Sequence, residues 1–186
     1  MINAQILIII IILIYLLKWI YYRQWESKQI YEQFKIIGGA TSSTYKVKNI
    51  FIKFVTKYID YNVYEREKYL STILHKFNWY PKLLYFNNKK KLLIFEYVGT
   101  PLTAKNAPND VFIQFNNILK DLDSVNIQHN DIKKGELLIN NNKLYLCDFG
   151  WASINNDLSC GINIWKGNKP YGVLKDSGAL KRIGII

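Results

Sequence analysis

"IQHNDIKKGELLINNNKLYLCDFG", residues 127–150, places two polar segments on either side of a hairpin pattern. Asp131 follows a His-Asn pair, and Asp148 stands directly before Phe149 and Gly150. The apolar runs on both sides of Asn140–Asn142 predict two strands joined by a tight turn, because asparagine tolerates the positive φ that such turns often need. A hairpin of this kind would fold the carboxylates of Asp131 and Asp148 towards one cleft.

Two more strand pairs are predicted upstream of this stretch. "YKVKNIFIKFV", residues 45–55, indicates two strands around a turn at Lys48–Asn49, and "PKLLYFNNKKKLLIFEYV", residues 81–98, indicates two more around Asn87–Asn88. The segment between them has mostly helical apolar spacing, which predicts a helix from about Tyr61 to Lys76.

Residues 108–125 predict a second, amphipathic helix, with Pro108 near its start. The segment "DSGALKRIG", residues 176–184, predicts at most a short closing helix. This order favours an α+β fold in which a small antiparallel sheet with one helix is joined to a mainly helical second lobe. The residues available for one face of the 108–125 helix are Val111, Phe112, Phe115, Ile118, Leu119 and Leu122.

The amino-terminal segment is different in character from the rest. Ile2 to Tyr22 has 21 residues and no charge except Lys18; as a helix it would rise about 31 Å, enough for a bilayer core. Lys18, Arg23 and Lys28 all follow the uncharged run Ile6–Leu17, so we expect an uncleaved single-pass anchor over residues 1–24, with the rest of the chain in the cytoplasm. A helix lying in the membrane plane, or one that binds a partner, is the alternative.

Charge and cysteine content limit the classes of partner. The net charge of +11 favours anionic partners such as phosphates, acidic lipid headgroups or nucleic acid. A nucleic-acid role is not expected, because no RNA-binding signature or zinc-finger spacing occurs. Cys147 and Cys160 form neither a metal cluster nor a disulfide framework, which is typical of a reducing compartment.

Several motifs in order give the chain its resemblance to a known family. Lys53 lies in the strand pattern "IFIKFV", and Glu67 lies on the helix that follows. "GGATSSTYKV", which begins with Gly38 and Gly39, precedes that strand, and "LLIFEYVG", residues 92–99, has the pattern of a hinge. With Asp131 and Asp148, these motifs make roughly residues 34–153 similar to the protein-kinase superfamily, in particular to compact RIO-type, lipopolysaccharide-kinase-like and large-DNA-virus kinase-like proteins.

The resemblance implies a two-lobed protein-kinase-like fold with a truncated C-lobe, preceded by the transmembrane helix. The kinase-like domain would span residues 30–186, with an N-lobe over about 30–98 and a reduced C-lobe over about 99–186. The cofactors implied are ATP and Mg²⁺, and the activity implied is transfer of the terminal phosphate to a hydroxyl acceptor that the sequence does not identify.

The resemblance also implies a role for each matching residue. The catalytic residues would be Asp131, as acid/base, and Lys133, as a cation beside the phosphates. Asp148 would be the principal Mg²⁺ ligand, while His129 would support the loop by packing. The residues implied in nucleotide binding are Gly38, Gly39, Lys53, Glu67, Glu96 and Val98.

Four departures from the family pattern keep catalytic activity open. Glu136 stands where the family has an asparagine that binds metal; it can supply an oxygen ligand but adds charge. Asn130 replaces the arginine that would read a phosphorylated activation loop, and Ile37 and Ser42 replace two glycines of the phosphate loop. Residues 151–186 have no Ala-Pro-Glu motif and are too few for the helical platform that docks protein substrates.

Three interpretations therefore remain. The first is a membrane-anchored kinase-like enzyme that acts on a small molecule, a lipid or a protein. The second is a catalytically weak or inactive pseudokinase that serves as a membrane-tethered binding module. The third is a basic membrane protein that binds nucleic acid or lipid.

Overall fold

The computed structural model describes residues 35–38, 42–55, 62–157 and 173–186. The chain divides into two units, residues 1–36 and 37–186, and nearly all of the first unit lies outside the described residues. The predicted anchor over residues 1–24 lies there too. Among the residues that are described, no helix is both long and apolar enough to cross a membrane.

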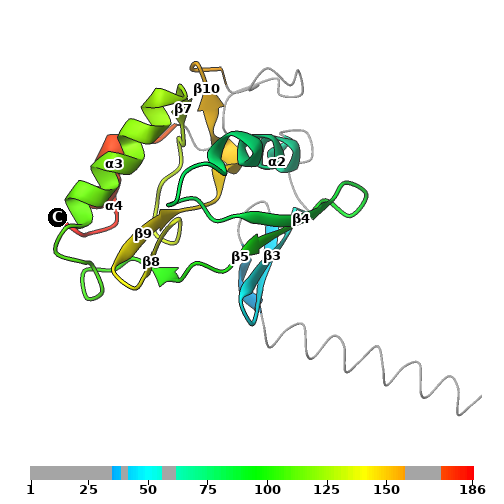
Figure 1. The fold of residues 1–186 in the computed structure, drawn as a ribbon, viewed down its shortest axis with the longest axis horizontal. Coiled ribbons are helices and arrows are strands. Elements are labelled where there is room, and N and C mark those ends of the chain that lie inside the picture. The colour runs from blue at the N-terminus through cyan, green and yellow to red at the C-terminus, as the bar shows by residue number, and fades with distance from the viewer. Residues whose placement is uncertain (1–34, 39–41, 56–61, 158–172) are drawn as a thin grey trace, which may run out of the picture. The chain divides into compact units, whose positions relative to one another are not determined.

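The second unit is α+β, with antiparallel pairing in each of its sheets for which a register is defined. Its largest sheet has five strands in the order β1-β2-β3-β5-β4 (Figure 1). The strands are β1 Lys35–Gly38, β2 Ser42–Val47, β3 Ile50–Val55, β4 Leu83–Asn87 and β5 Leu92–Glu96.

Both strand pairs predicted for this sheet are confirmed. The β2–β3 turn falls at Lys48–Asn49 as expected, and Lys48 takes the positive φ that closes it (52°). The β4–β5 turn occupies residues 88–91, slightly later than predicted, because Asn87 still pairs with Leu92. β4 forms one edge of the sheet.

One helix packs beside this sheet, as predicted. Helix α2, Val63–Leu74, lies next to β4 and β5 (Figure 1). It starts and ends two residues inside the bounds expected from the sequence. Besides apolar side chains such as Leu70 and Leu74, it buries the charged side chains of Arg66 and Glu67. Its inner face therefore contributes charged groups to the interior as well as apolar packing.

The part of the chain after Val98 differs from the expectation of a mainly helical lobe. Its described residues contain one helix of several turns, α3 Val111–Ser124, and a single-turn helix, α4 Ala179–Arg182. Short strands account for much of the rest, because the apolar segments between the polar loops are only long enough for hairpins. The remaining elements are β6 Thr100–Pro101, β7 Ile127–Gln128, β8 Leu137–Asn140, β9 Lys143–Leu146, η2 Phe149–Trp151, β10 Ser153–Ile154 and η3 Asp176–Gly178.

The predicted hairpin is present as β8 and β9, in which Asn140 pairs with Lys143. Asn141 and Asn142 both have positive φ (48° and 62°), which confirms the expected use of asparagine in this turn. The hairpin packs against α3, whose buried face is narrower than predicted: Phe112 is 44% exposed. The buried residues of α3 are Val111, Phe115, Ile118 and Leu122.

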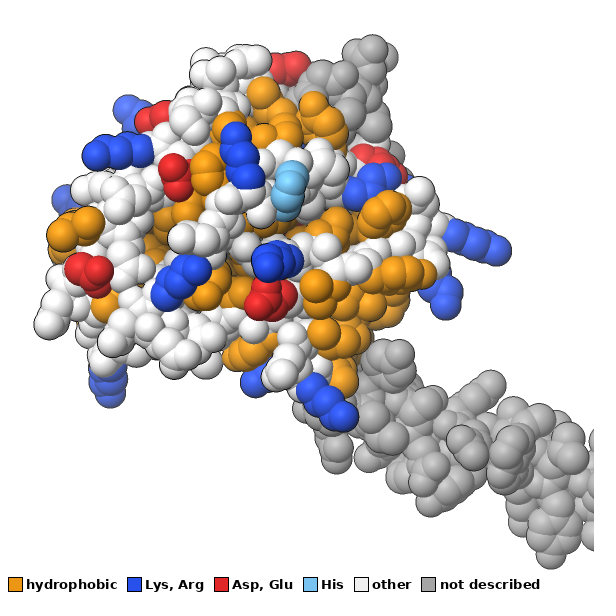
Figure 2. All heavy atoms as spheres, in the orientation of Figure 1, with side chains coloured by type: hydrophobic (Ala, Val, Ile, Leu, Met, Phe, Trp, Pro, Cys, Tyr) orange, Lys and Arg blue, Asp and Glu red, His pale blue; other side chains and the backbone are white. Residues whose placement is uncertain are grey.

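A single cluster of buried apolar side chains extends from the five-stranded sheet through α2 and the hairpin to α3. The polar loops that flank the hairpin lie against this cluster, with Ile132 and Phe149 fully buried at their bases. On the outside, lysine and arginine side chains are more numerous than acidic ones on the face seen in Figure 2. The core therefore fixes the polar loops, while the surface carries the positive charge.

Candidate functional site

The centre of the site is an ammonium group held between two carboxylates. Lys53, on β3, donates to Oε2 of Glu67 on α2 at 2.7 Å and to Oδ1 of Asp148 at 2.8 Å. The side chains of Lys53 and Glu67 are 3% and 4% exposed, whereas that of Asp148 is 40% exposed. The bridge thus joins the sheet, the helix and the loop before η2, and it is open to solvent on the Asp148 side.

Each of the three charged groups in this bridge has a shifted pKa. Burial alone would lower the pKa of Lys53, but the charges of Asp148 and Glu67 raise it well above its ordinary value. Burial would raise the pKa of Asp148, but the ammonium of Lys53 lowers it. Burial raises the pKa of Glu67 to about 7, and the charge of Asp148 adds to the increase. Asp148 therefore stays negatively charged, whereas Glu67 takes up a proton as the pH falls below about 7.

The backbone around Asp148 is held in an unusual conformation. Asp148 has φ 63° and ψ 65°, a region that L-residues seldom occupy. The next residue, Phe149, is fully buried, with its ring edge-on to His129 at 4.6 Å and to Tyr80 at 5.6 Å. Burial of Phe149 fixes the residue before it, so the Asp148 carboxylate is directed by a packing contact one residue away.

Gly150 brings the same segment close to α2. The buried Arg66 donates from Nη1 to the carbonyl oxygen of Gly150 at 2.6 Å. A Cβ on Gly150 would lie 2.5 Å from Cγ1 of Val63, so only glycine fits without a shift. Helix α2 therefore contacts Gly150 directly, through Arg66 and Val63, and is joined to Asp148 indirectly, because its Glu67 binds Lys53 of β3.

The loop with Asp131 is organised by His129. The backbone N–H of Asp131 donates to Nδ1 of His129 at 3.3 Å, so Nε2 carries the proton and donates to the carbonyl oxygen of Cys147 at 2.9 Å. Burial lowers the pKa of His129, which favours this neutral form. The histidine thus links the Asp131 loop to the residue before Asp148, in the supporting role expected for it.

Asp131, Lys133 and Glu136 lie together at the open end of the loop. Lys133 Nζ donates to Oδ2 of Asp131 at 3.0 Å, and the backbone N–H of Lys133 donates to Oε2 of Glu136 at 3.1 Å. Burial would lower the pKa of Lys133, but Asp131 raises it. The structure therefore brings Asp131 and Lys133 into direct contact, with Glu136 bound to the same turn.

Glu136 and Asp148 are two carboxylates that act on each other. Burial raises the pKa of Glu136 to about 7, and the negative charge of Asp148 is the next cause. The two residues belong to adjoining backbone segments, since Cys147 N–H donates to the carbonyl oxygen of Glu136 at 3.0 Å. Among the described residues, no three His, Cys, Asp or Glu side chains are grouped to hold a metal ion, so the protein supplies a pair of carboxylates here and not a complete cage.

Asn130 ties the loop to the segment after Gly150. Its side-chain amide donates to the carbonyl oxygen of Trp151 at 3.2 Å and to Oγ of Ser153 at 3.0 Å. At this position the sequence predicted only the loss of an arginine. The structure shows that the asparagine instead makes buried hydrogen bonds of its own.

Two residues near the carboxyl terminus hold the same loop and were missed by the sequence analysis. The carboxylate of Asp176 accepts the backbone N–H groups of His129 and Asn130 at 2.7 and 2.9 Å. Arg182 donates from Nη2 to the carbonyl oxygen of Ile132 at 2.9 Å. No local pattern marks these roles, because the partners are backbone atoms 46 to 50 residues away.

The other predicted nucleotide-binding residues are less connected to this centre. Glu96 ends β5 with an exposed side chain, and Val98 is buried. Lys53 pairs with Leu93 across the sheet, three residues before Glu96. Gly38 ends β1, and Gly39 lies outside the described residues.

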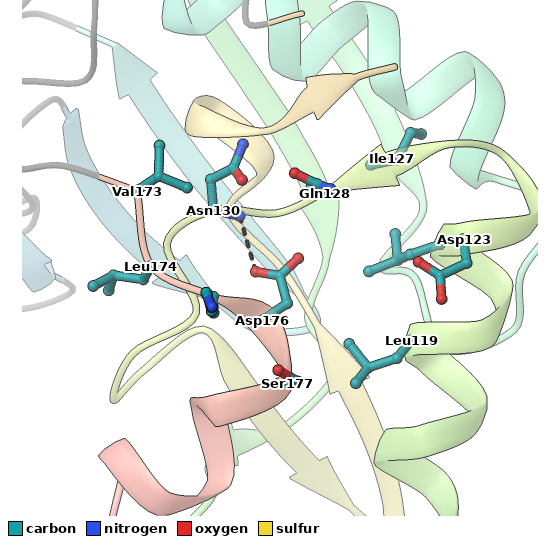
Figure 3. A pocket seen from close by; sticks show the side chains of 11 residues that line it. Leu119, Asp123, Ile127, Gln128, Asn130, Val173, Leu174, Asp176 and Ser177 are labelled. Carbon is teal, nitrogen blue, oxygen red and sulfur yellow. Dashed lines mark hydrogen bonds between the residues drawn. The ribbon is translucent and has the colours of Figure 1, made fainter. Parts of the chain in front are cut away.

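A hollow of about 370 Å³ lies beside the Asp131 loop, where Asn130 is one of the lining residues (Figure 3). α3, β7 and the segment before α4 line it, and the Asp176 carboxylate binds the Asn130 backbone at its edge. Neither Lys53, Asp131 nor Asp148 lines it. This hollow is therefore separate from the charged centre.

No protein-family model matches the chain, and no curated protein matches it.

Proposed function

We propose that the chain is a membrane-anchored, protein-kinase-like protein that binds Mg·ATP and passes the terminal phosphate to a hydroxyl acceptor. The observation that carries the proposal is the bridge from Lys53 to Glu67 and Asp148, with Asp131 and Lys133 in contact on the neighbouring loop. Phosphoryl transfer needs a held cation, a metal-binding carboxylate and a carboxylate for the acceptor hydroxyl; Lys53, Asp148 and Asp131 would supply them.

The donor set fits the two groups that the proposal requires. Mg²⁺ commonly takes one or two protein carboxylates and completes its shell with water and phosphate oxygens, and Asp148 and Glu136 are such a pair. Lys53 would bind the phosphates, with Glu67 holding its ammonium in place. ATP would supply the phosphoryl group, and Mg²⁺ would balance its negative charge. Burial and, after it, the negative charge of Asp148 raise the pKa of Glu136 to about 7; a bound cation would relieve the repulsion between the two carboxylates.

Asp131 would orient the acceptor hydroxyl and take its proton. Its carboxylate is buried among neighbours except at the edge where Lys133 binds Oδ2, and its backbone is fixed by His129. Lys133 would place positive charge beside the transferred group. The residues proposed for these roles lie on four different segments, which hydrogen bonds and the buried core join together.

One observation favours the pseudokinase alternative. The pKa of Glu136 is raised to about 7, so this carboxyl group is partly protonated near neutral pH and is then a weak metal ligand. Binding of nucleotide without transfer would follow if the second metal contact fails. For an active kinase, the acceptor would be a small molecule, a lipid or a protein.

The decisive test is nucleotide binding by the full chain in detergent, with and without Mg²⁺. A fluorescent ATP analogue should bind more tightly with Mg²⁺, and Asp148→Asn should weaken the Mg²⁺-dependent part by roughly tenfold or more. Asp123→Asn, an equal change of charge on the exposed end of α3, is the matched control. Absence of binding under both conditions would rule the proposal out; binding without transfer of labelled phosphate would identify a pseudokinase.

The anchor is tested separately. We propose that residues 1–24 span the membrane with the remainder in the cytoplasm, on the basis of the uncharged apolar run and the basic residues after it. The full chain should then stay with the membranes during carbonate extraction. Release into the supernatant would favour a peripheral helix.

A further inference from the structure

The free edge of the five-stranded sheet carries an apolar surface with lysines around it. Three consecutive residues of the edge strand β4 are about half exposed: Leu84 at 55%, Tyr85 at 51% and Phe86 at 48%. Tyr69, on the neighbouring helix α2, is 39% exposed. Single exposed apolar residues are ordinary, but a consecutive run on an edge strand is a feature that proteins usually avoid. We call Tyr69 and Leu84–Phe86 the β4 patch.

Positive charge predominates around the β4 patch. Residues 68–95 contain six lysines and no Asp or Glu. Lys82, Lys89 and Lys90 are exposed at the two ends of β4, and Lys68 Nζ lies over the ring of Phe86, 5.4 Å from its centre. On the side where the β4–β5 turn projects in Figure 1, basic and apolar side chains stand next to each other in Figure 2.

The nearest acidic side chain is already neutralised. Glu65, on the first turn of α2, binds Lys68 at 2.6 Å and Lys91 at 2.9 Å. Burial would raise the pKa of Glu65, but hydrogen bonds from these two lysines lower it, so the carboxylate stays charged and paired. Lysine therefore predominates around β4, although the exposed Glu96 lies beside Lys82: its backbone N–H donates to the Lys82 carbonyl oxygen at 2.9 Å.

We infer that the β4 patch docks on an anionic lipid surface. Exposed Leu, Tyr and Phe side chains enter the boundary between headgroups and acyl chains, and lysines bind acidic headgroups while their methylene stems cover apolar surface. The patch supplies both components on one edge of the fold. This inference is independent of the phosphotransferase proposal and uses only the described residues of α2, β4 and the turn after it.

A second copy of the chain fits this edge less well. Antiparallel pairing of β4 with itself would bring Lys82 of one copy near Lys89 and Lys90 of the other. Like charges facing each other across a strand pair are destabilising. An acidic peptide bound along β4 would neutralise the lysines, but it would not cover the apolar side chains of Leu84, Tyr85 and Phe86. A lipid surface satisfies both features.

The test is hydrogen exchange of the full chain, followed by mass spectrometry, in the presence of lipid vesicles. Vesicles of phosphatidylcholine are compared with vesicles that also contain about 30% phosphatidylserine, at roughly physiological salt. We expect amides in residues 82–91 to exchange about tenfold more slowly when anionic vesicles are added, and to show no such change with neutral vesicles. Raising the salt to about 1 M should remove the effect.

Matched variants separate the patch from general positive charge. Lys82→Gln, Lys89→Gln and Lys90→Gln together should abolish the protection, as should Leu84→Ser with Phe86→Ser. The control replaces Lys105, Lys120 and Lys181, which are also exposed, by Gln and should keep the protection. All these positions are on the surface, and unchanged thermal unfolding of each variant shows that the fold is intact.

Other outcomes would overturn the inference. Equal exchange of residues 82–91 with neutral and anionic vesicles would show that acidic lipid is not the partner. Protection without vesicles that grows with protein concentration would identify a second copy in its place. Protection by polyglutamate but not by anionic vesicles would identify an acidic polypeptide.

Discussion

Lys53 Nζ lies 2.8 Å from Oδ1 of Asp148, although 95 residues separate them in the chain. The same ammonium lies 2.7 Å from Oε2 of Glu67. One buried cation therefore holds the sheet, helix α2 and the Asp148 loop together.

Replacing the ammonium should destabilise the fold more at high pH than at low pH. Lys53→Met keeps the length of the side chain but leaves the buried Glu67 carboxylate without its cation, which should cost about 3 kcal/mol of unfolding free energy at pH 8. The pKa of Glu67 is about 7 even with Lys53 present, so at pH 5.5 Glu67 protonates and the loss shrinks. Urea unfolding at both pH values measures the difference. The double variant Lys53→Met/Glu67→Gln should recover part of the loss at pH 8, and no recovery would contradict the bridge.

The contact between Gly150 and Val63 gives a steric prediction. Gly150→Ala places a Cβ 2.5 Å from Cγ1 of Val63, so α2 or the Asp148 segment must move, at a cost of roughly 1–3 kcal/mol. Val63→Ala removes that atom. In a double-mutant cycle the two changes together should cost less than the sum of the single changes. Strict additivity would show that the two elements are not in contact in solution.

Asp176 should hold the Asp131 loop in place. Asp176→Ala removes the acceptor of two backbone N–H groups, those of His129 and Asn130, and should cost roughly 2–4 kcal/mol, since each buried donor left without a partner costs about 1–3. Asp176→Asn keeps one oxygen acceptor and should cost less. Hydrogen exchange of residues 127–132 reports the local effect. Asp157→Ala, at an exposed position outside this loop, should leave that exchange unchanged.

Glu136 should make stability fall as the pH rises. In the unfolded chain its carboxyl group loses the proton near its ordinary value of 4.5, whereas in the folded chain it keeps the proton up to about pH 7. Between these values the folded state binds more protons, so its contribution to stability is present below about 4.5 and is lost as the pH passes 7. Between pH 5 and 8, Glu136→Gln should gain roughly 1–2 kcal/mol relative to the native chain, after allowance for partial exposure. A constant difference between the two proteins would show that Glu136 titrates normally.

Three substitutions should separate the roles of the acidic residues in the proposed chemistry. Asp131→Asn should spare nucleotide binding and reduce phosphate transfer by roughly 100-fold or more. Asp148→Asn should weaken Mg²⁺-dependent binding. Glu136→Asn should keep binding and preserve or raise transfer, because it removes a charge that repels Asp148. Loss of metal-dependent binding in Glu136→Asn would instead identify the glutamate as an adapted ligand.

Local sequence was sufficient for most of the secondary structure. The turn at Lys48–Asn49, the hairpin around Asn140–Asn142 and the two longer helices all follow from apolar spacing and from residues that accept positive φ. These features depend on neighbours a few positions away in the chain. For the same reason, the order of motifs was enough to predict that Lys53 and Glu67 could pair across a strand and the following helix.

Long-range packing decided what the sequence could not. Asp176 and Arg182 bind backbone atoms of a loop some 50 residues away, and a backbone partner leaves no trace in the residue types of that loop. The exposed side of α3 at Phe112 and the strand-rich region after Val98 depend on which surfaces neighbouring elements cover. The sequence by itself therefore determined most of the longer elements and supplied the candidate site residues. The tertiary structure alone decided which groups share the Lys53 ammonium and what holds the Asp131 loop, because burial and backbone hydrogen bonds arise only when distant segments meet.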